Sequence, residues 1–373
     1  MKILFISRAY PPILGGIENQ NAALAEWLPK HADVTTIFNP YGRIFLPFFA
    51  PYALARALLS LRSYDIVLLG DGTISLIGWV IKKCTDKKVA SVVHGLDINW
   101  NSSSLGVWYE RALILLYRLF WVRVFIPSLD ILIAVGNETI RQGIAHGIPE
   151  SKFVFVPNGV DTDRFSPKTI PKERLAEILK TDIAGKRVIY TGGRLVRRKG
   201  VAWFIRNVLP ALPENVLYAV SGDGPDRGHI EQSVADANMN DRVFLLGRVS
   251  DEDRDILLAT CDLFVQPNIP VKGDMEGFGL VVLEAASAGI PVVVSRLEGL
   301  KDAIRDKENG CFAEPENAAS FISAIDRLLS DEPERKRFGA QARIFTREHY
   351  HWEKISAQYI DILKRQLESG KRK

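Results

Sequence analysis

The segment KILFISRAYPPILGGIENQ, residues 2–20, contains an apolar run, a loop with two adjacent glycines and the beginning of a helical stretch. The run KILFIS (2–7) is typical of a strand that is buried on both faces of a parallel sheet. Gly15 and Gly16 follow it and precede residues with helical spacing. This order of strand, loop and helix predicts the first unit of an α/β fold with right-handed crossovers.

The same alternation of apolar runs and helical stretches continues along the chain in two series. The further runs are VTTIF (34–38), DIVLLG (65–70), VASVVHG (89–95), DILIAVG (130–136) and FVFVPN (153–158), and then RVIYTGG (187–193), LYAVSGD (217–223), VFLLG (243–247), DLFVQPN (262–268) and PVVVSR (291–296). Strands that alternate with helices in this way predict parallel sheets, and the two series predict two of them.

A polar segment separates the two series. Residues 166–186 contain two prolines and several charges, which is typical of a domain boundary. After Pro333 the pattern is helical only, and it is rich in Lys and Arg. We therefore predict a domain over residues 1–168, a second over 169–350 and a C-terminal helix over 351–373. Doubly wound domains bind ligands at the carboxyl ends of their strands.

The composition is that of a globular protein and excludes several classes of function. Of the 373 residues, 47% are hydrophobic and 25% are charged, which excludes a disordered or collagen-like chain. The formal net charge of +4 is too small to indicate a nucleic-acid partner. Cys84, Cys261 and Cys311 lie far apart and lack metal-ligand spacing, as is common in the reducing cytosol.

The loop TGGRLVRRKG (191–200) is a candidate anion site. It follows a predicted strand and carries four cations between glycines. Arginine offers a fork of donors and lysine a mobile point charge, and the helix that follows adds its positive end. We expect Arg194 and Lys199 to bind phosphate. Arg197 and Arg198 are expected to belong to a solvated face.

The segment EGFGLVVLEAASAGIPVV (276–293) carries two carboxylates, the second of them about a turn and a half into a predicted helix. Glu276 lies in a loop before two glycines, and Glu284 lies in the predicted helix. Carboxylates accept hydroxyl hydrogens, and the N-terminus of the helix favours negative charge. The pair fits the two ends of a nucleoside-diphosphate sugar. The glycine loops at 15–16 and 221–227 are equally compatible with plain turns.

These motifs together resemble the retaining glycosyltransferases of family 4, which have the GT-B fold. The resemblance runs through nearly the whole chain, and it depends on the ordered set rather than on one motif. The set comprises the Gly-Gly pair, VVHGLD (92–97), PNGVDTDRF (157–165), GRLVRRKG (193–200), GDGP (222–225), the two glutamates and AGIPVV (288–293). It implies two Rossmann-like domains that face each other across a cleft, with the C-terminal helix returning to the N-terminal domain.

The resemblance implies which residues bind the nucleotide of the donor. The Gly16 amide, Arg194 and Lys199 would bind the diphosphate, and Glu284 would bind the ribose. The remaining candidate donor-binding residues are Gly15, Gly193, Gly222 and Leu280. No cofactor is implied, because the nucleotide sugar is itself a substrate.

The resemblance also implies which residues surround the transferred sugar. Glu276 and the backbone of Phe278 and Gly279 would bind the sugar, and His94 would lie beside the reacting carbon. Asp97 follows His94 in the same turn and is a further candidate. The candidate catalytic residues are His94, Glu276, Arg194 and Lys199.

Asp161 and Asp163 form an Asp-x-Asp motif, which holds a metal ion in another class of glycosyltransferase. Here the motif lies directly after the sixth strand, where the resemblance implies a structural or acceptor-side turn. Two cations and two helix ends can neutralise the departing diphosphate without a metal. We therefore expect activity that is independent of metal.

The predicted reaction is transfer of a hexosyl group from a nucleotide-diphosphate sugar, with retention of configuration, to a glycan or a lipid-linked acceptor. This would place the enzyme in polysaccharide or lipopolysaccharide biosynthesis. The loop IPVKGDM (269–275) is similar to that of mannosyltransferases acting on phosphatidylinositol and favours GDP-mannose, with a UDP-sugar as the alternative. A GT-B nucleotide-sugar epimerase and a non-catalytic GT-B binding scaffold are the alternative functions.

Two segments predict peripheral contact with a membrane. Residues 43–62 and 107–126 mix aromatic and aliphatic residues with arginines, as interfacial helices do. The apolar stretch within the second segment is shorter than a bilayer span and is interrupted by arginines. We expect a cytoplasmic enzyme at the inner face of the cytoplasmic membrane, although packing against a sheet would also explain the apolar positions of the second segment. The basic residues at 371–373 would add attraction to anionic lipid.

Overall fold

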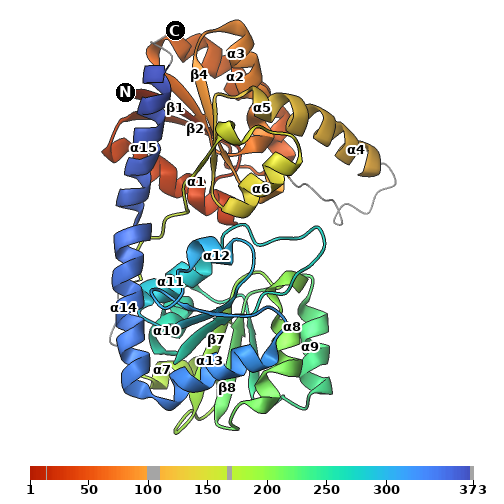
Figure 1. Ribbon diagram of the computed structural model, residues 1–373, viewed down its shortest axis with the longest axis vertical. Helices are drawn as coiled ribbons and strands as arrows, with labels where there is room; N and C mark the ends of the chain where they lie inside the picture. Colours follow the sequence, from red (N-terminus) through yellow and green to blue (C-terminus); the bar gives the residue numbers. More distant parts are fainter. Residues whose placement is uncertain (14, 99–109, 166–169, 370–373) are drawn as a thin grey trace. The chain divides into compact units, whose positions relative to one another are not determined.

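The computed structural model describes residues 1–13, 15–98, 110–165 and 170–369 (Figure 1). Contacts within the chain divide it into two units. Unit 1 comprises Met1–Gly159 and Trp352–Lys373, and unit 2 comprises Val160–His351. The chain therefore passes from unit 1 to unit 2 and then back again.

Unit 1 is built on a six-stranded sheet with the order β2-β1-β3-β4-β5-β6, in which every paired neighbour is parallel. The strands are β1 (Lys2–Ser7), β2 (Asp33–Phe38), β3 (Ile66–Leu69), β4 (Lys88–Val93), β5 (Ile131–Ala134) and β6 (Phe153–Phe155). The chain winds from β1 toward one edge and then toward the other, so the topological switch point lies between β1 and β3.

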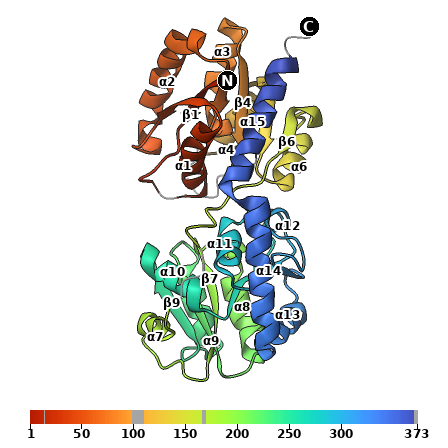
Figure 2. The ribbon, with the colours of Figure 1, turned by 90° about the vertical axis from the view of Figure 1, so that its left-hand side faces the viewer.

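Helices cover both faces of this sheet. On one face, apolar residues of α2 (Leu46–Ser60), α3 (Ser75–Cys84) and η6 (Arg118–Phe125) pack on the strands. On the other face, apolar residues of α1 (Gly16–Trp27) and α15 (Trp352–Ser369) pack on the strands. These two helices lie side by side in Figures 1 and 2. The π-helical segment η6 joins α4 (Glu110–Tyr117) to α5 (Ile126–Ser128), and α6 (Asn137–Ala145) links β5 to β6.

Unit 2 repeats this architecture with the strand order β12-β11-β10-β7-β8-β9, and its paired strands are also parallel. The strands are β7 (Arg187–Gly192), β8 (Val216–Ser221), β9 (Val243–Gly247), β10 (Leu263–Gln266), β11 (Val292–Ser295) and β12 (Cys311–Ala313). Its switch point lies between β7 and β10. The predicted fold, with two doubly wound α/β sheets, is confirmed.

The helices of unit 2 form two layers. One layer contains α7 (Glu173–Leu179), α10 (Asp251–Thr260), α11 (Leu280–Ala288), α12 (Leu300–Ala303) and α14 (Glu332–Tyr350). The other contains α8 (Val201–Asn207), α9 (Arg227–Asp236) and α13 (Ala318–Ser330). The α14 helix packs against α11, the helix that carries Glu284.

Candidate active site

The loops that follow β7 and β10 meet at the switch point of unit 2. Gly200 has φ +67°, and a Cβ atom there would lie 1.8 Å from the Pro267 carbonyl oxygen. The backbone N–H of Ile269 donates to the carbonyl of Arg198, with the two atoms 2.9 Å apart. This close approach brings the cations at 197–199 against the loop that leads to Glu276.

Lys199 and Glu276 form a buried ion pair in this contact. The Nζ atom of Lys199 lies 2.6 Å from Oε2 of Glu276, and the Nδ2 group of Asn268 donates to the same oxygen at 3.2 Å. Both side chains are about one-tenth exposed. Burial by itself would raise the pKa of Glu276, but Lys199 and then Arg198 lower it to about 2. Glu276 is therefore ionised throughout the physiological range.

The position of Arg198 differs from the solvated face expected from the sequence. Its side chain is only 19% exposed, so the interpretation of Arg198 as part of a solvated face is wrong. Its NH1 group donates to both carboxylate oxygens of Asp274, at 3.0 and 3.2 Å, and its Nε lies 3.7 Å from Glu276. Arg197 is exposed and contacts His229. Arg198 and Asn268 are thus site residues that sequence reasoning missed.

The helix α11 begins directly after this loop. Gly279 precedes it with φ +89°, and among the described residues no side chain caps its first turn. Phe278 is buried in the core beside Tyr350, so only its backbone is available to a ligand. Leu280 is half-buried and packs on the same core. The Val282 N–H donates to the Gly279 carbonyl at 3.1 Å, and the uncapped N-terminus of α11 favours negative charge.

Glu284 lies one turn into α11 and is half-buried. Burial raises the pKa of Glu284, while Arg254 and Arg164 oppose the increase. Because burial removes water from this carboxylate, a ligand hydroxyl that donates a hydrogen bond to it replaces the lost hydration and stabilises its charge.

Two glycine turns lie together at the ends of β7 and β8. Gly193 has φ +127° and Gly222 has φ +121°. A Cβ atom on Gly222 would lie 1.8 Å from the Gly193 carbonyl oxygen. The backbone N–H of Gly193 donates to Ser221, and that of Gly222 donates to Gly247. Arg194 follows this turn with an exposed side chain and has no ion pair among the described residues.

The switch point of unit 1 carries a second polar cluster. Arg8 follows β1 and Asp71 follows β3, and the Arg8 Nε lies 3.0 Å from Oδ1 of Asp71. Thr73 hydrogen-bonds to both side chains. Asp71 is fully buried. Sequence reasoning missed these residues, although each directly follows an apolar strand at the sheet edge where ligands bind.

His94 and Asp97 belong to the same cluster, at the end of β4. Oδ2 of Asp97 accepts the backbone N–H groups of His94, at 2.8 Å, and of Gly72, at 3.0 Å. Burial raises the pKa of Asp97 to about 7, with the Asp71 charge adding to the effect. The two strand-end loops are therefore tied together by one carboxylate.

The His94 ring is buried and faces the Gly70 carbonyl oxygen, which lies 3.2 Å from Nε2. A carbonyl only accepts hydrogen bonds, so Nε2 carries the proton. Burial lowers the pKa of His94, against the opposing effect of Asp71. The ring is neutral at pH 7, and Nδ1 is then its acceptor atom.

Gly15 and Gly16 lie at the beginning of α1. Gly15 is the residue before the helix, and a Cβ atom there would lie 2.2 Å from Oε2 of Glu18. A Cβ atom on Gly16 would meet nothing within 4 Å. The space beside Gly16 is therefore unoccupied by other described residues, and its role in binding the diphosphate stays a prediction.

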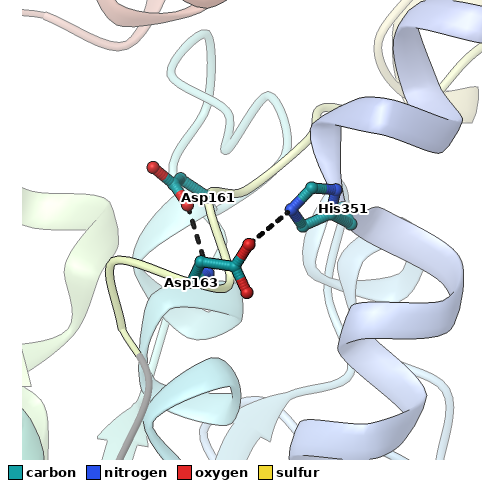
Figure 3. A group of neighbouring side chains, drawn as sticks. All are labelled: Asp161, Asp163 and His351. Atoms are coloured by element: carbon teal, nitrogen blue, oxygen red, sulfur yellow. Dashed lines mark hydrogen bonds and ion pairs between the residues drawn. The ribbon is translucent and has the colours of Figure 1, made fainter.

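Asp161 and Asp163 lie in a turn with His351 beside them, as Figure 3 shows. Oδ1 of Asp161 accepts the N–H groups of Asp163 and Arg164, each at 3.1 Å. Asp163 pairs with Arg347 at 3.4 Å and with His351 at 3.6 Å. The three possible ligand atoms lie within 4.8 Å of one another, so the group has metal-ligand spacing. Its carboxylates are engaged in holding the turn and α14.

Within each unit, the site offers distinct chemistry. Unit 2 provides a buried ionised carboxylate, an exposed arginine, an amine and the uncapped N-terminus of a helix. This combination suits a diphosphate that is attached to a polyol. Unit 1 provides a neutral imidazole and an open helix N-terminus above a buried acidic cluster. Both sets lie at topological switch points.

Comparisons with known proteins agree with this geometry. A family model described as "Glycosyl transferases group 1" matches residues 176–345, and the model "Glycosyltransferase Family 4" matches residues 14–164. The two matches together span most of the chain.

Related sequences and structures cover nearly the whole length. An uncharacterised glycosyltransferase of Methanocaldococcus jannaschii is 25% identical, over 99% of each chain. The GDP-mannose-dependent alpha-(1-6)-phosphatidylinositol monomannoside mannosyltransferase of Mycolicibacterium smegmatis is 24% identical, over 97% of this chain and 98% of its own. The Anabaena protein HepE, solved in complex with UDP, has the same fold, with a TM-score of 0.72 at 19% identity over 98% of this chain and 100% of its own. The chain therefore belongs to the family 4 glycosyltransferases and depends on a nucleotide-sugar donor.

Proposed function

We propose that the chain transfers a hexosyl group from a nucleotide-diphosphate sugar to a lipid-linked or glycan acceptor, with retention of the anomeric configuration and without a metal ion. The observation that carries this proposal is the buried Lys199–Glu276 ion pair at the switch point of unit 2. It puts a cation that can bind phosphate beside a carboxylate that can bind hydroxyls, and α11 begins four residues after that carboxylate.

The diphosphate is the group that most needs stabilisation. Cleavage of the anomeric bond develops negative charge on it, and preorganised positive charge lowers that barrier. Lys199 and Arg194 supply this charge, and the Gly16 amide adds a donor. Arg194 has no competing carboxylate among the described residues, so it is available to a phosphate without breaking an ion pair.

The sugar and the ribose bind to the carboxylates. Glu276, ionised and held by Asn268, accepts hydroxyl hydrogens of the sugar together with the backbone at 278–279. Glu284 accepts those of the ribose. His94, neutral and with Nδ1 as an acceptor, orients a hydroxyl near the reacting carbon.

The donor is GDP-mannose in this proposal, and the acceptor is attached to lipid. The M. smegmatis relative carries both features in its name, and it aligns along the whole chain. The UDP bound to HepE keeps a UDP-sugar as the alternative donor. Such an acceptor places the reaction at the cytoplasmic side of a membrane.

Donor hydrolysis without acceptor tests the proposal. The purified protein is incubated with GDP-mannose or UDP-sugars, and the nucleotide released is measured with and without EDTA. We expect GDP-mannose to be hydrolysed at a rate that EDTA does not change. Lys199→Ala and Arg194→Ala should each lower kcat by about 10²–10³. Arg197→Ala, an exposed cation of the same loop, is the matched control.

Three outcomes would count against parts of this proposal. Equal rates in all four proteins would remove the assignment of the phosphate residues. Loss of activity in EDTA that Mg²⁺ or Mn²⁺ restores would make a metal part of the mechanism, and Asp161→Asn would then test the turn in Figure 3. A glycoside product with inverted configuration in NMR spectra would exclude retention.

A further inference from the structure

One face of unit 1 carries large apolar side chains in water. On α2, Phe48 is 75% exposed, Tyr52 is 55% exposed and Leu59 is 87% exposed. Their spacing of four and seven residues puts them on one side of the helix. Phe49, on the other side, is buried against the sheet. Ile44, just before the helix, is 86% exposed.

The helical segment formed by α4 and η6 adds to this face. Its exposed apolar residues are Leu115, Leu116, Leu119, Phe120 and Val124. Because α3 packs against both α2 and η6, and all three cover the same side of the sheet, their outer surfaces point away from the sheet in the same direction. We call the outer surface of α2 and of α4–η6 the outer face.

Among the side chains that the structure describes on α2 and at residues 114–125, every charged one is an arginine. Residues 34–64 contain no Asp or Glu but include Arg56 and Arg62, both exposed. Arg118 and Arg123 are exposed on η6. Among the described residues, none of these four arginines forms an ion pair. Cations left without partners beside apolar side chains complement a surface that is itself anionic and apolar.

The inner side of the helical segment formed by α4 and η6 touches the candidate active site. The hydroxyl of Tyr117 donates to the Asp97 carbonyl at 2.8 Å, and Nε1 of Trp121 donates to the Thr73 carbonyl at 2.6 Å. The two rings stack, with centroids 5.5 Å apart. The same helical segment thus has one side in solvent and the other on the loops that carry His94 and Asp71.

We propose that the outer face binds an anionic lipid bilayer, and that Tyr117 and Trp121 transmit this binding to the loops of the active site. Phe48, Tyr52 and Leu59 enter the boundary of the acyl chains, while the arginines reach the headgroups. No described helix has the length and hydropathy to cross a bilayer, so the contact is peripheral. The binding stands on its own, whereas its effect on activity rests on the proposed function.

A protein partner fits the outer face less well. A protein surface opposite it would have to supply carboxylates for several separate arginines and an apolar patch between them. A bilayer supplies both over any area. A second copy of this chain would bring arginines against arginines, since a two-fold interface pairs a surface with itself.

Cosedimentation with vesicles tests the binding. The full chain is mixed with vesicles of phosphatidylcholine alone or containing phosphatidylglycerol, at low and high salt. We expect it to sediment only with the anionic vesicles, and less at high salt. The double variant Phe48→Ser, Leu59→Ser should lower the partition coefficient at least about tenfold. Ile344→Ser, an isolated exposed apolar position on α14, is the matched control.

Several results would overturn the binding. One is that the parent protein does not sediment with anionic vesicles at low salt. Another is that the parent and the double variant bind the vesicles equally. Thermal unfolding of the double variant at the parent temperature excludes a folding defect, because the substituted side chains are in solvent. A dimer that forms without lipid and is lost in the double variant would assign the outer face to self-association instead.

Donor hydrolysis in the presence of vesicles tests the transmission. We expect anionic vesicles to change kcat for the parent, and Trp121→Phe to bind vesicles equally while losing most of that change. Tyr117→Phe serves as the second variant. An unchanged response in both variants would overturn the transmission and leave the binding intact. Absence of hydrolysis in every condition would count against the proposed function, not the lipid contact.

Discussion

Arg197 and Arg198 are adjacent in sequence, and their surroundings differ. Arg197 lies in solvent beside His229, whereas Arg198 bridges Asp274 and Glu276. The contact of its NH1 group with both carboxylate oxygens of Asp274 fixes the loop before α11 against the loop after β7. We infer that Arg198 is a positioning residue for Glu276.

A double-mutant cycle checks this inference. Arg198→Ala should lower kcat/KM about tenfold, which corresponds to about 1.4 kcal/mol. Asp274→Asn should lower it less in the Arg198→Ala background than in the parent, because the partner is already absent. Arg197→Ala should stay near the parent value. Additive losses from the two substitutions would show that the ion pair does not position Glu276.

The raised pKa of Asp97 predicts how the free energy of unfolding depends on pH. Burial raises the pKa of Asp97 to about 7, whereas an unfolded chain releases this proton near pH 4. Between these values the folded protein holds a proton that the unfolded chain has lost. The contribution of Asp97 to stability is therefore largest below about pH 4 and is lost as the pH rises through about 7.

Asp97→Asn should remove this dependence. Its amide oxygen can still accept the N–H groups of His94 and Gly72. Urea unfolding at pH 5 and pH 8 should then show a smaller loss of stability for the variant than for the parent. Parallel losses in the two proteins would mean that Asp97 does not hold a proton in the folded state.

The residues that sequence alone could identify are those in motifs. Lys199 and Glu276, predicted as parts of one donor site, do contact each other, and Gly193 contacts Gly222. Arg8 and Asp71 could not be identified, because their partnership joins loops 63 positions apart and depends on strand order. The roles of the predicted site residues stay predictions until they are measured.

At the scale of elements, the ends of β7 and β8 approach so closely that only glycine fits. Gly222→Ala would put a methyl group 1.8 Å from the Gly193 carbonyl and force φ +121° on an L residue. We expect it to cost roughly 1–3 kcal/mol of unfolding free energy and to weaken donor binding.

Gly228→Ala in α9 is the matched control. Nothing lies within 4 Å of its added methyl group, and alanine favours the helix, so stability should be unchanged or rise by up to about 1 kcal/mol. Chemical unfolding of both variants, together with nucleotide-induced thermal shifts, measures these effects. Equal stability of the two variants would mean that the β7 and β8 loops are not packed as described.

The predicted strands agree closely with the observed ones, because continuous Val, Ile and Leu runs are distinctive. The exception is β12, which the sequence analysis did not predict. Its three residues, Cys311–Ala313, are too few for a periodic pattern, and pairing with β11 defines the strand. The helix α2, Leu46–Ser60, lies within residues 43–62, where the sequence analysis expected a helix at a membrane surface.

At the scale of the whole molecule, unit 2 is one continuous segment and unit 1 is not. The second face of the unit 1 sheet packs on α15, where Trp352, Ile355 and Tyr359 are buried. Residues 160–351 expressed alone should therefore fold cooperatively and bind the donor nucleotide, as thermal shift would show. Residues 1–159 alone should lack a cooperative transition and regain it when a 352–373 peptide is added. A cooperative transition of 1–159 without the peptide would contradict this dependence.

The return of the chain also determines the order in which the molecule can be completed during translation. The strands of unit 1 and α1 are synthesised first, but the part of the second face that α15 covers stays exposed until α15 leaves the ribosome. Synthesis of unit 2 intervenes and takes roughly 10–40 s at about 5–20 residues per second. During that delay the nascent chain exposes the apolar residues of β4 that α15 later contacts, so this part of the sheet face is where a ribosome-associated chaperone would bind.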